Sequence, residues 1–131
     1  MEKKICIDTC AYTAFQNGNR ALLELFDTCD ELVFPITVIG ELQFGFSFGT
    51  RYAENMACLK DFIAKANATI ANTTLETAFR YGLLASTLKK NGTPIPQNDI
   101  WTAAITMELG AHLATLDTDF SVVPGLIVEA F

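Results

Sequence analysis

Four carboxylate residues stand at corresponding places in the chain, beside an apolar run or in the first turns of a helix. These residues are Asp8, Glu41, Asp99 and Asp117. Asp8 ends the apolar run 5–7, and a carboxylate that follows a buried strand needs a partner or a use. If the apolar runs form parallel strands, the residues at their carboxyl ends converge on one crevice. Four negative charges gathered there repel one another unless a cation neutralises them, and a site made only of oxygen ligands favours Mg²⁺ or Mn²⁺.

Each carboxylate also has an ordinary structural explanation. Asp8 and Asp99 suit the first turn of a helix, where the macrodipole favours acids. Glu41 suits a solvated helix face, and Asp117 suits a turn in which its side chain bonds the backbone. Together these explanations are weaker, because Asp8, Glu41 and Asp117 each follow an apolar segment that leads to the same edge of the sheet. The sequence therefore favours a divalent-metal site and leaves the separate explanations open.

Short apolar runs alternate with helical patterns, and these elements must position the acids. Strands are predicted for residues 5–7, 32–36, 68–71, 112–117 and 126–131. Such alternation implies parallel pairing, and the predicted fold is a three-layer α/β/α sandwich with a central, mainly parallel sheet. The chain of 131 residues is 50% hydrophobic, which is enough for one core and too little for two, so a single domain over residues 1–131 is expected.

Polar residues are predicted to cap three of the helices. Thr37 is expected at the start of the helix that follows the second strand. Thr73 and Glu76 fit a capping box that opens the helix before the Asn-Gly pair near position 91. Asn98 is predicted to cap the helix that carries Asp99.

The formal net charge of −6 argues against non-specific electrostatic binding of nucleic acid, because phosphate binding normally needs a basic surface. Loading the four carboxylates with metal weakens this objection, since leaving them out of the count changes the charge from −6 to −2. The N-terminal apolar run is too short for a signal peptide, and no stretch approaches the roughly 20 apolar residues of a membrane span, so a cytoplasmic protein without membrane contact is expected. The four cysteines form no C-x-x-C pair and are expected to be reduced core thiols.

Three segments taken in order resemble the motifs of a known family. They read "IDTCAY", "ITVIGELQFG" and "GTPIPQNDIWTAAITMELGAHLATLDTDFSVVPGLIVEAF". Their order and spacing resemble a PIN domain, and specifically the VapC-type toxins of bacterial toxin-antitoxin pairs. The resemblance implies a metal-dependent endoribonuclease with Mg²⁺ or Mn²⁺ as cofactor. It places Asp8, Glu41 and Asp99 at the family's three acidic positions and Asp117 at a fourth, more variable one.

Three further residues acquire a possible role only through this resemblance. Asp119 corresponds to a fifth acidic position, as a residue that supports the metal site or as a surface residue before Phe120. Thr9 and Thr115 resemble the family's hydroxyls beside the acids, which orient ligands or bound water. A helix cap and a strand residue are equally good explanations of these two threonines.

The resemblance also implies a mechanism and partners. A metal-bound water would attack the RNA phosphodiester and leave a 5′-phosphate and a 3′-hydroxyl, with no histidine base required. Arg51, Lys89 and Lys90 are candidate contacts to the RNA phosphates, and the alternative for each is a solubilising surface charge. The implied partners are an RNA substrate, a cognate antitoxin and a second copy of the chain in a homodimer.

The stretch "FGFSFG" at 44–49 carries three phenylalanines at a spacing of two. This spacing does not fit one helical stripe, and either core packing or an apolar surface for an antitoxin explains it. Phe44 and Phe48 lie four residues apart and are predicted to share a stripe that faces the core. Phe46 is then expected to point away from the core, toward the antitoxin.

Other classes of protein have a similar length and pattern. A receiver domain needs a lysine late in the chain, whereas the last lysine here is Lys90. A phosphatase with an aspartate nucleophile needs a second aspartate two residues after Asp8, where Cys10 stands. A PIN-fold nuclease that processes RNA without acting as a toxin, and a non-catalytic binding module with the same fold, stay open as alternatives.

Overall fold

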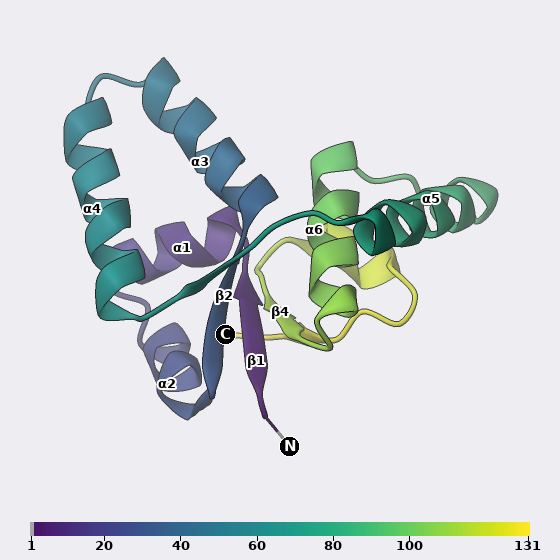
Figure 1. Cartoon of the computed structure of the whole chain (residues 1–131), viewed down its shortest axis with the longest axis horizontal. Helices are drawn as coiled ribbons and strands as arrows, with labels where there is room; N and C mark the ends of the chain where they lie inside the picture. Colours follow the sequence, from purple (N-terminus) through teal and green to yellow (C-terminus); the bar gives the residue numbers. More distant parts are fainter. Residues whose placement is uncertain (1) are drawn as a thin grey trace.

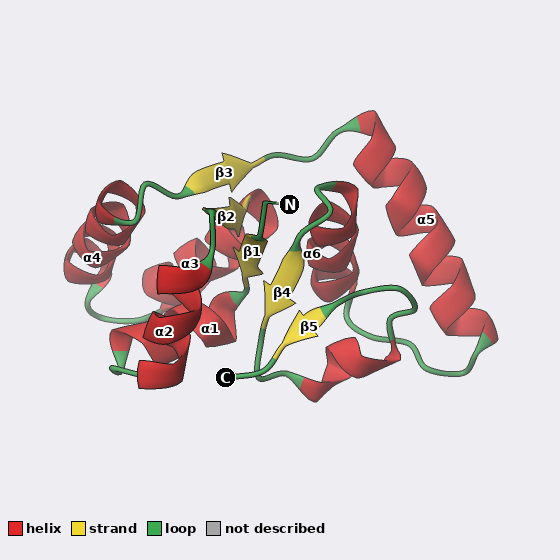
Figure 2. Cartoon of the chain, turned by 90° about the horizontal axis from the view of Figure 1, so that it is seen from below, coloured by secondary structure: helices red, strands yellow, loops and turns green. Residues whose placement is uncertain are grey.

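A computed structural model describes residues 2–131 of the chain, and its centre is a five-stranded sheet in which every pairing is parallel. The strands are β1 (Lys4–Ile7), β2 (Glu31–Pro35), β3 (Thr69–Ala71), β4 (His112–Ala114) and β5 (Val128–Glu129). Their spatial order is β3-β2-β1-β4-β5, so the first strand of the chain lies in the middle (Figure 2). The two last strands are shorter than the apolar runs that predicted them.

Helices cover both faces of this sheet. They are α1 (Thr9–Gln16), α2 (Arg20–Thr28), α3 (Ile36–Phe48), α4 (Tyr52–Lys65), α5 (Leu75–Lys90) and α6 (Gln97–Glu108), with a short 3₁₀ turn at Thr118–Val122. Helices α1 to α4 lie on one face, and α5 and α6 lie on the other (Figures 1 and 2). The three-layer α/β/α sandwich predicted from the alternation of strands and helices is confirmed.

Each face of the sheet has its own core, because successive side chains of a strand point to opposite faces. Ile5 and Ile7 of β1 are fully buried against α1 to α4, and Tyr12 and Phe62 form an edge-to-face aromatic pair there. Cys6, between them, faces the second core, which α5 and α6 supply. Because its side chains alternate between the two cores, β1 packs against both helical layers.

The register of the strands brings their carboxyl ends together. Ile7 pairs with Ala114, so the residues that follow each of them emerge side by side from the central strands β1 and β4. Pro35 ends β2 next to this pair, and α3 starts directly after it. The chain thus leaves three strands at one edge of the sheet, which we call the carboxyl edge.

All three cap predictions are wrong in position. Helix α3 begins at Ile36 after Pro35, and the Thr37 hydroxyl instead shares a 2.9 Å hydrogen bond with Thr102 of α6. The capping box of α5 consists of Thr74 and Thr77, one residue beyond the predicted pair Thr73 and Glu76. Both threonine hydroxyls also donate to Glu108 of α6, a contact that ties the two helices together. Helix α6 begins at Gln97 after Pro96, so Asn98 lies inside its first turn.

Two further expectations concern the chain as a whole. Within residues 2–131, no helix combines the length and the apolar character needed to cross a membrane. The four cysteines are free, and only Cys6 is buried. Cys29 is partly buried, and Cys10 and Cys58 are exposed, so the expectation of core thiols is correct for Cys6 alone.

Candidate metal centre

Asp8 is held in place where β1 ends and α1 begins. It caps α1, and its Oδ1 accepts a 2.8 Å hydrogen bond from the backbone N–H of Ala11. Its Oδ2 accepts a short hydrogen bond from the Thr115 hydroxyl. Only 5% of Asp8 is exposed, and this burial raises the pKa of its carboxyl group, while both hydrogen bonds lower it and the nearby Asp117 raises it again. Asp8 is therefore a buried acid with a fixed orientation and no basic partner among the described residues.

Thr115 connects Asp8 to the loop that follows β4. Its hydroxyl oxygen accepts a 2.9 Å hydrogen bond from the backbone N–H of Asp117 while it donates to Asp8. The Oδ1 of Asp117 then accepts a 2.9 Å hydrogen bond from the backbone N–H of Asp119, which opens the 3₁₀ turn. A single buried hydroxyl thus positions two of the predicted acids relative to each other.

The carboxylates of Asp99, Asp117 and Asp119 lie close together beside this loop. One oxygen of each lies within 4.8 Å of the others. Asp99 comes from the first turn of α6, so the group joins two segments of the chain. Burial, together with the negative charges of Asp117, Glu41, Asp119 and Asp8, raises the pKa of Asp99 to about 6.

Glu41 completes the group from the second turn of α3. Its Oε2 accepts a 2.8 Å hydrogen bond from the side-chain amide of Asn98 in α6. Burial raises the pKa of Glu41, the hydrogen bond from Asn98 lowers it, and the charge of Asp8 raises it. We call Asp8, Glu41, Asp99, Asp117 and Asp119 the carboxylate cluster.

The carboxylate cluster has the donor chemistry of a divalent-cation site. All of its ligating atoms are oxygens, which hard cations such as Mg²⁺ and Mn²⁺ prefer. None of the ion pairs formed within residues 2–131 involves a member of the cluster. Burial raises the pKa values of Asp8, Glu41 and Asp99, and the negative charges of neighbouring acids add to this effect. The residues present therefore fit a bound divalent metal.

The predicted basic contacts lie outside this cluster. Arg51 stands in the connection between α3 and α4, at the end of this helical pair remote from the sheet (Figure 1), and pairs with Glu54. Lys89 and Lys90 are exposed in the last turn of α5. Thr9, in contrast, is the first residue of α1 and lies beside the carboxylate cluster.

The prediction of which phenylalanines of α3 face the core is wrong. Phe46 is partly buried and packs against the core between α3 and the sheet. Phe44 and Phe48 are 73% and 88% exposed, and their rings stack at a centroid distance of 6.3 Å. Helix α3 is rotated about its axis relative to the expectation, because Val38 and Leu42 set its core-facing side and Phe46 lies four residues after Leu42.

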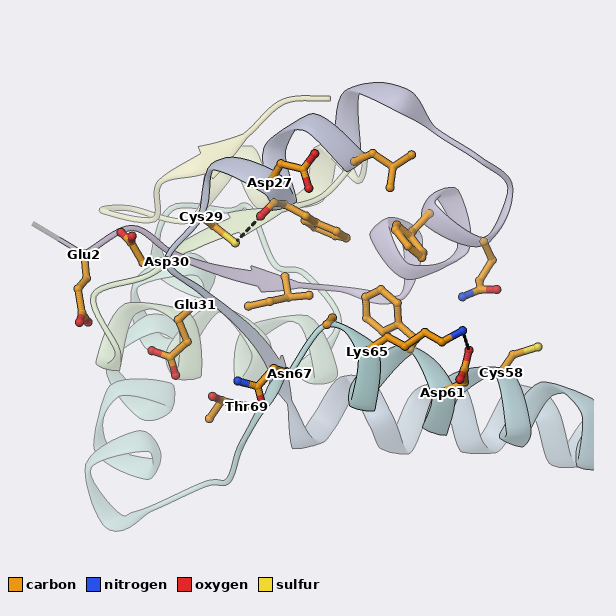
Figure 3. A pocket seen from close by; sticks show the side chains of 17 residues that line it. Glu2, Asp27, Cys29, Asp30, Glu31, Cys58, Asp61, Lys65, Asn67 and Thr69 are labelled. Atoms are coloured by element: carbon orange, nitrogen blue, oxygen red, sulfur yellow. Dashed lines mark hydrogen bonds and ion pairs between the residues drawn. The ribbon is translucent and has the colours of Figure 1, made fainter.

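A cavity of about 910 Å³ lies at the other end of the strands (Figure 3). Glu31 and Thr69, the first residues of β2 and β3, lie in its wall with the apolar side chains of Phe15 and Phe62. Several acids also line it, and we call it the acidic cavity. It contains none of the predicted site residues.

Sequence reasoning missed Asn98, Thr37 and Trp101 at the site. It assigned Asn98 and Thr37 to helix caps, whereas Asn98 holds Glu41 and Thr37 bonds α6. The position of Asn98 directly before Asp99 was the signal available, because a polar residue beside a predicted ligand is a candidate to orient another ligand. Trp101 lines a groove beside Glu41 and gave no signal in the sequence.

Comparison with known proteins places this site in a family. The sequence model of the PIN domain matches residues 5–126. The chain belongs to the PIN domain family. This PIN domain is 33% identical over 87 residues to Ribonuclease VapC1 of Haemophilus influenzae, a match that covers 66% of the chain and 63% of that relative. It is 29% identical over 108 residues to Ribonuclease VapC2 of Rickettsia felis, covering 82% of the chain and 79% of the relative.

The fold of this PIN domain is also found in solved structures. A crystal structure of VapBC2 from Rickettsia felis, bound to a DNA fragment from its promoter, contains a chain that superposes with a TM-score of 0.87. The sequences are 25% identical, and the superposition covers 98% of both chains. The parallel sheet and its helical layers are thus those of a known toxin-antitoxin structure.

Proposed function

We propose that this PIN domain is a metal-dependent endoribonuclease and the toxin of a toxin-antitoxin pair. The observation that carries the proposal is the carboxylate cluster, in which five acids from four segments converge without a basic partner among residues 2–131. Its likeness to two relatives named as ribonucleases supports the substrate class. An RNA phosphodiester is the bond that we expect it to hydrolyse.

Asp8, Glu41, Asp99 and Asp117 are the ligands that we propose for the metal, with Asp119 as a further contact. Mg²⁺ or Mn²⁺ held there would supply an activated water and neutralise charge on the phosphate. Thr115 and Ala11 together orient the Asp8 carboxylate, since the Thr115 hydroxyl donates to Oδ2 and the Ala11 backbone N–H donates to Oδ1. Asn98 fixes one oxygen of Glu41 and leaves the other free to face the cluster.

The protonation state of the cluster sets when it can accept a cation. Asp99, with a pKa of about 6, loses its proton between weakly acidic and neutral pH. Burial of Asp8 keeps bulk water from competing for its oxygens. Asp99 is therefore ionised at neutral pH, which is the state that a divalent cation requires of a carboxylate ligand.

A cognate antitoxin is the partner that we propose for this chain. The supporting observation is the likeness to the VapBC2 complex, at 25% identity over nearly the whole chain. A homodimer and a cytoplasmic location stay predictions. The competing proposal is a PIN-fold nuclease that processes RNA without arresting growth, and the location of the carboxylate cluster is the same in both.

The proposal is tested with purified protein and a panel of structured RNAs, with and without Mg²⁺ or Mn²⁺. We expect cleavage only with metal, products with 5′-phosphate ends, and no cleavage by the Asp99→Asn variant. Expression of the wild type alone should arrest growth of a bacterial host, and Asp99→Asn at the same soluble level should not. Cleavage without arrest would favour the processing nuclease, and no cleavage of any RNA would favour a binding module.

A further inference from the structure

An open groove of about 720 Å³ adjoins the carboxylate cluster between α3 and the start of α6. Two aromatic side chains line it, Phe44 from α3 and Trp101 from α6, together with the amides of Gln97 and Asn98. Glu41 belongs both to this groove and to the carboxylate cluster. Whatever occupies the groove is therefore adjacent to the group that reacts at the cluster.

The aromatic rings offer flat faces at this surface. Phe44 is 73% exposed, and its ring stacks on that of Phe48 at the surface of α3. The indole of Trp101 stacks on Tyr81 of α5 with a centroid distance of 4.1 Å and an interplanar angle of 15°. Tyr81 packs against the core, so this stacking fixes the plane of the indole ring.

The charge of the groove excludes a phosphate as its preferred occupant. No lysine, arginine or histidine of the described chain lines it, and its one ionisable side chain is Glu41. Stacking and amide hydrogen bonds are the interactions that remain, and proteins bind unpaired bases of single-stranded RNA with this combination. The groove thus suits an uncharged planar ring with polar edges.

We propose that this groove binds the nucleobase next to the scissile phosphodiester, by stacking on Phe44 and by hydrogen bonds to the Gln97 and Asn98 amides. The assignment rests on the proposed ribonuclease function, because it takes the carboxylate cluster as the place where the phosphodiester reacts. Asn98 links the two events, since the amide that lines the groove also holds Glu41. Base binding explains how a chain with a net charge of −6 can hold RNA with little help from basic residues.

Phe44→Ala tests the proposal, with Phe79→Ala as a matched control. Phe79 lies on α5, is 66% exposed and does not line the groove. Both substitutions remove an exposed phenylalanine, so neither should lower the melting temperature appreciably. The probe is a set of single-stranded oligoribonucleotides that carry 2-aminopurine at one position, titrated with protein in Ca²⁺ to hold back hydrolysis.

We expect the wild type and Phe79→Ala to quench the 2-aminopurine fluorescence equally, because the base stacks on an aromatic ring. Phe44→Ala should lose the quenching and bind about tenfold more weakly. In cleavage assays, an abasic nucleotide beside the mapped cleavage site should raise the KM of the wild type by a similar factor. The same abasic RNA should cause no further loss in Phe44→Ala, since the stacking partner is already absent.

The two proposals fail in different ways. One outcome is that Phe44→Ala cleaves RNA as the wild type does and that all three proteins quench the fluorescence equally. This outcome overturns the base-binding groove and leaves the proposed ribonuclease function standing. This outcome would assign Phe44 to a protein contact. Quenching that depends on Phe44 without any metal-dependent cleavage supports base binding in the groove, but it overturns the ribonuclease and with it the position of the base beside a scissile phosphodiester. Absence of quenching by the wild type overturns the groove whether or not RNA is cleaved.

Discussion

The carboxylate cluster and the acidic cavity both gather acids at an end of the sheet, yet they balance the charge differently. In the acidic cavity, Asp61 pairs with Lys65 at 3.0 Å (Figure 3), and Glu31 lies 4.0 Å from Lys4. Asp30 accepts a 2.6 Å hydrogen bond from the backbone N–H of Lys3. Glu31 and Asp61 therefore have counter-charges within the chain. The other acids of the cavity, Glu2, Asp27 and Asp30, are exposed to solvent, so they need nothing further.

The carboxylate cluster differs in both respects. Asp8 is buried, and the ion pairs of residues 2–131 leave out all five of its members. Burial and mutual repulsion raise the pKa values of Asp8, Glu41 and Asp99. Acidic composition alone therefore does not mark a metal site. The carboxylate cluster is distinguished by its missing counter-charge, because partly buried acids of like charge are stabilised by a proton or an external cation.

The largest contrast is expected between Asp8→Asn and Asp61→Asn. Asparagine at position 8 keeps an oxygen that can accept from Ala11 but loses the charge, so cleavage should fall by more than about 100-fold while the fold persists. Asp61→Asn removes an exposed charge of the acidic cavity, and cleavage should stay within about twofold of the wild type. Initial rates on one RNA measure both. Equal losses in the two variants would remove the distinction between the regions.

A smaller loss is expected when the cluster keeps its charges and loses its alignment. Thr115→Val removes the hydroxyl that donates to Asp8 and accepts from Asp117, and such supporting contacts are typically worth about 10- to 100-fold in metal affinity or activity. Thr115→Ser retains the hydroxyl and should recover most of the activity. The dependence of cleavage on Mn²⁺ concentration should shift in the valine variant. If valine and serine behave alike, the hydroxyl does not position the cluster.

Metal should stabilise the protein through the carboxylate cluster. At an Mn²⁺ concentration about 100 times the dissociation constant, binding to the folded state adds about 2.7 kcal/mol to the free energy of unfolding. Thermal unfolding should show this as a rise in melting temperature for the wild type and Asp61→Asn. Asp99→Asn should show little or no rise, and a rise equal to that of the wild type would place the ion elsewhere.

The metal-free protein should become more stable as the pH falls from 7 to 5. The pKa of Asp99 is about 6 in the fold and near 3.8 in the unfolded chain, so the folded state binds its proton first. The raised pKa values of Asp8 and Glu41 act in the same direction. Ionised acids destabilise the fold above their folded pKa, and this destabilisation is relieved as the pH drops through it. Glu129 and Glu54 have lowered pKa values, so their opposite contribution is lost only below about pH 4.5.

Urea denaturation in chelator at several pH values measures this effect. Asp99→Asn should flatten the dependence, because the variant has no proton to gain at that position. Saturating Mn²⁺ should reverse the slope, since protons then compete with the ion for the same oxygens. Stability that rises steadily from pH 5 to 7 in chelator would show that the cluster is not repulsive.

The smallest effect is expected in the acidic cavity. Lys65→Ala removes the partner of Asp61, and both side chains are more than half exposed. Exposed pairs of this kind contribute about 0.3 to 0.5 kcal/mol, and salt screens them. The variant should cleave RNA as the wild type does and lose only a few tenths of a kcal/mol in urea denaturation at low salt. A loss above about 2 kcal/mol would show that the acidic cavity also depends on its counter-charge.

Several features of this PIN domain were determined by the sequence by itself. The apolar run at 5–7 ends where β1 ends, and the run at 32–36 extends one residue beyond β2, because a helical pattern starts there. Asp8 and Glu41 lie after these two strands, Asp99 lies in the first turn of α6, and Asp117 lies in the loop after β4. Local patterns sufficed here because each acid stands within a few residues of the element that carries it.

Only the tertiary structure decided how these elements meet. Asn98 and Glu41 are 57 residues apart, and their contact depends on α3 and α6 lying side by side. The Thr115 contact to Asp8 depends on the pairing of β1 with β4, which are the first and fourth strands of the chain. The orientation of Phe46 toward the core depends on the rotation of α3 about its axis. Helical and strand periodicity specify which residues share a face, but strand order, register and helix rotation arise from packing between distant segments, and no local pattern contains them.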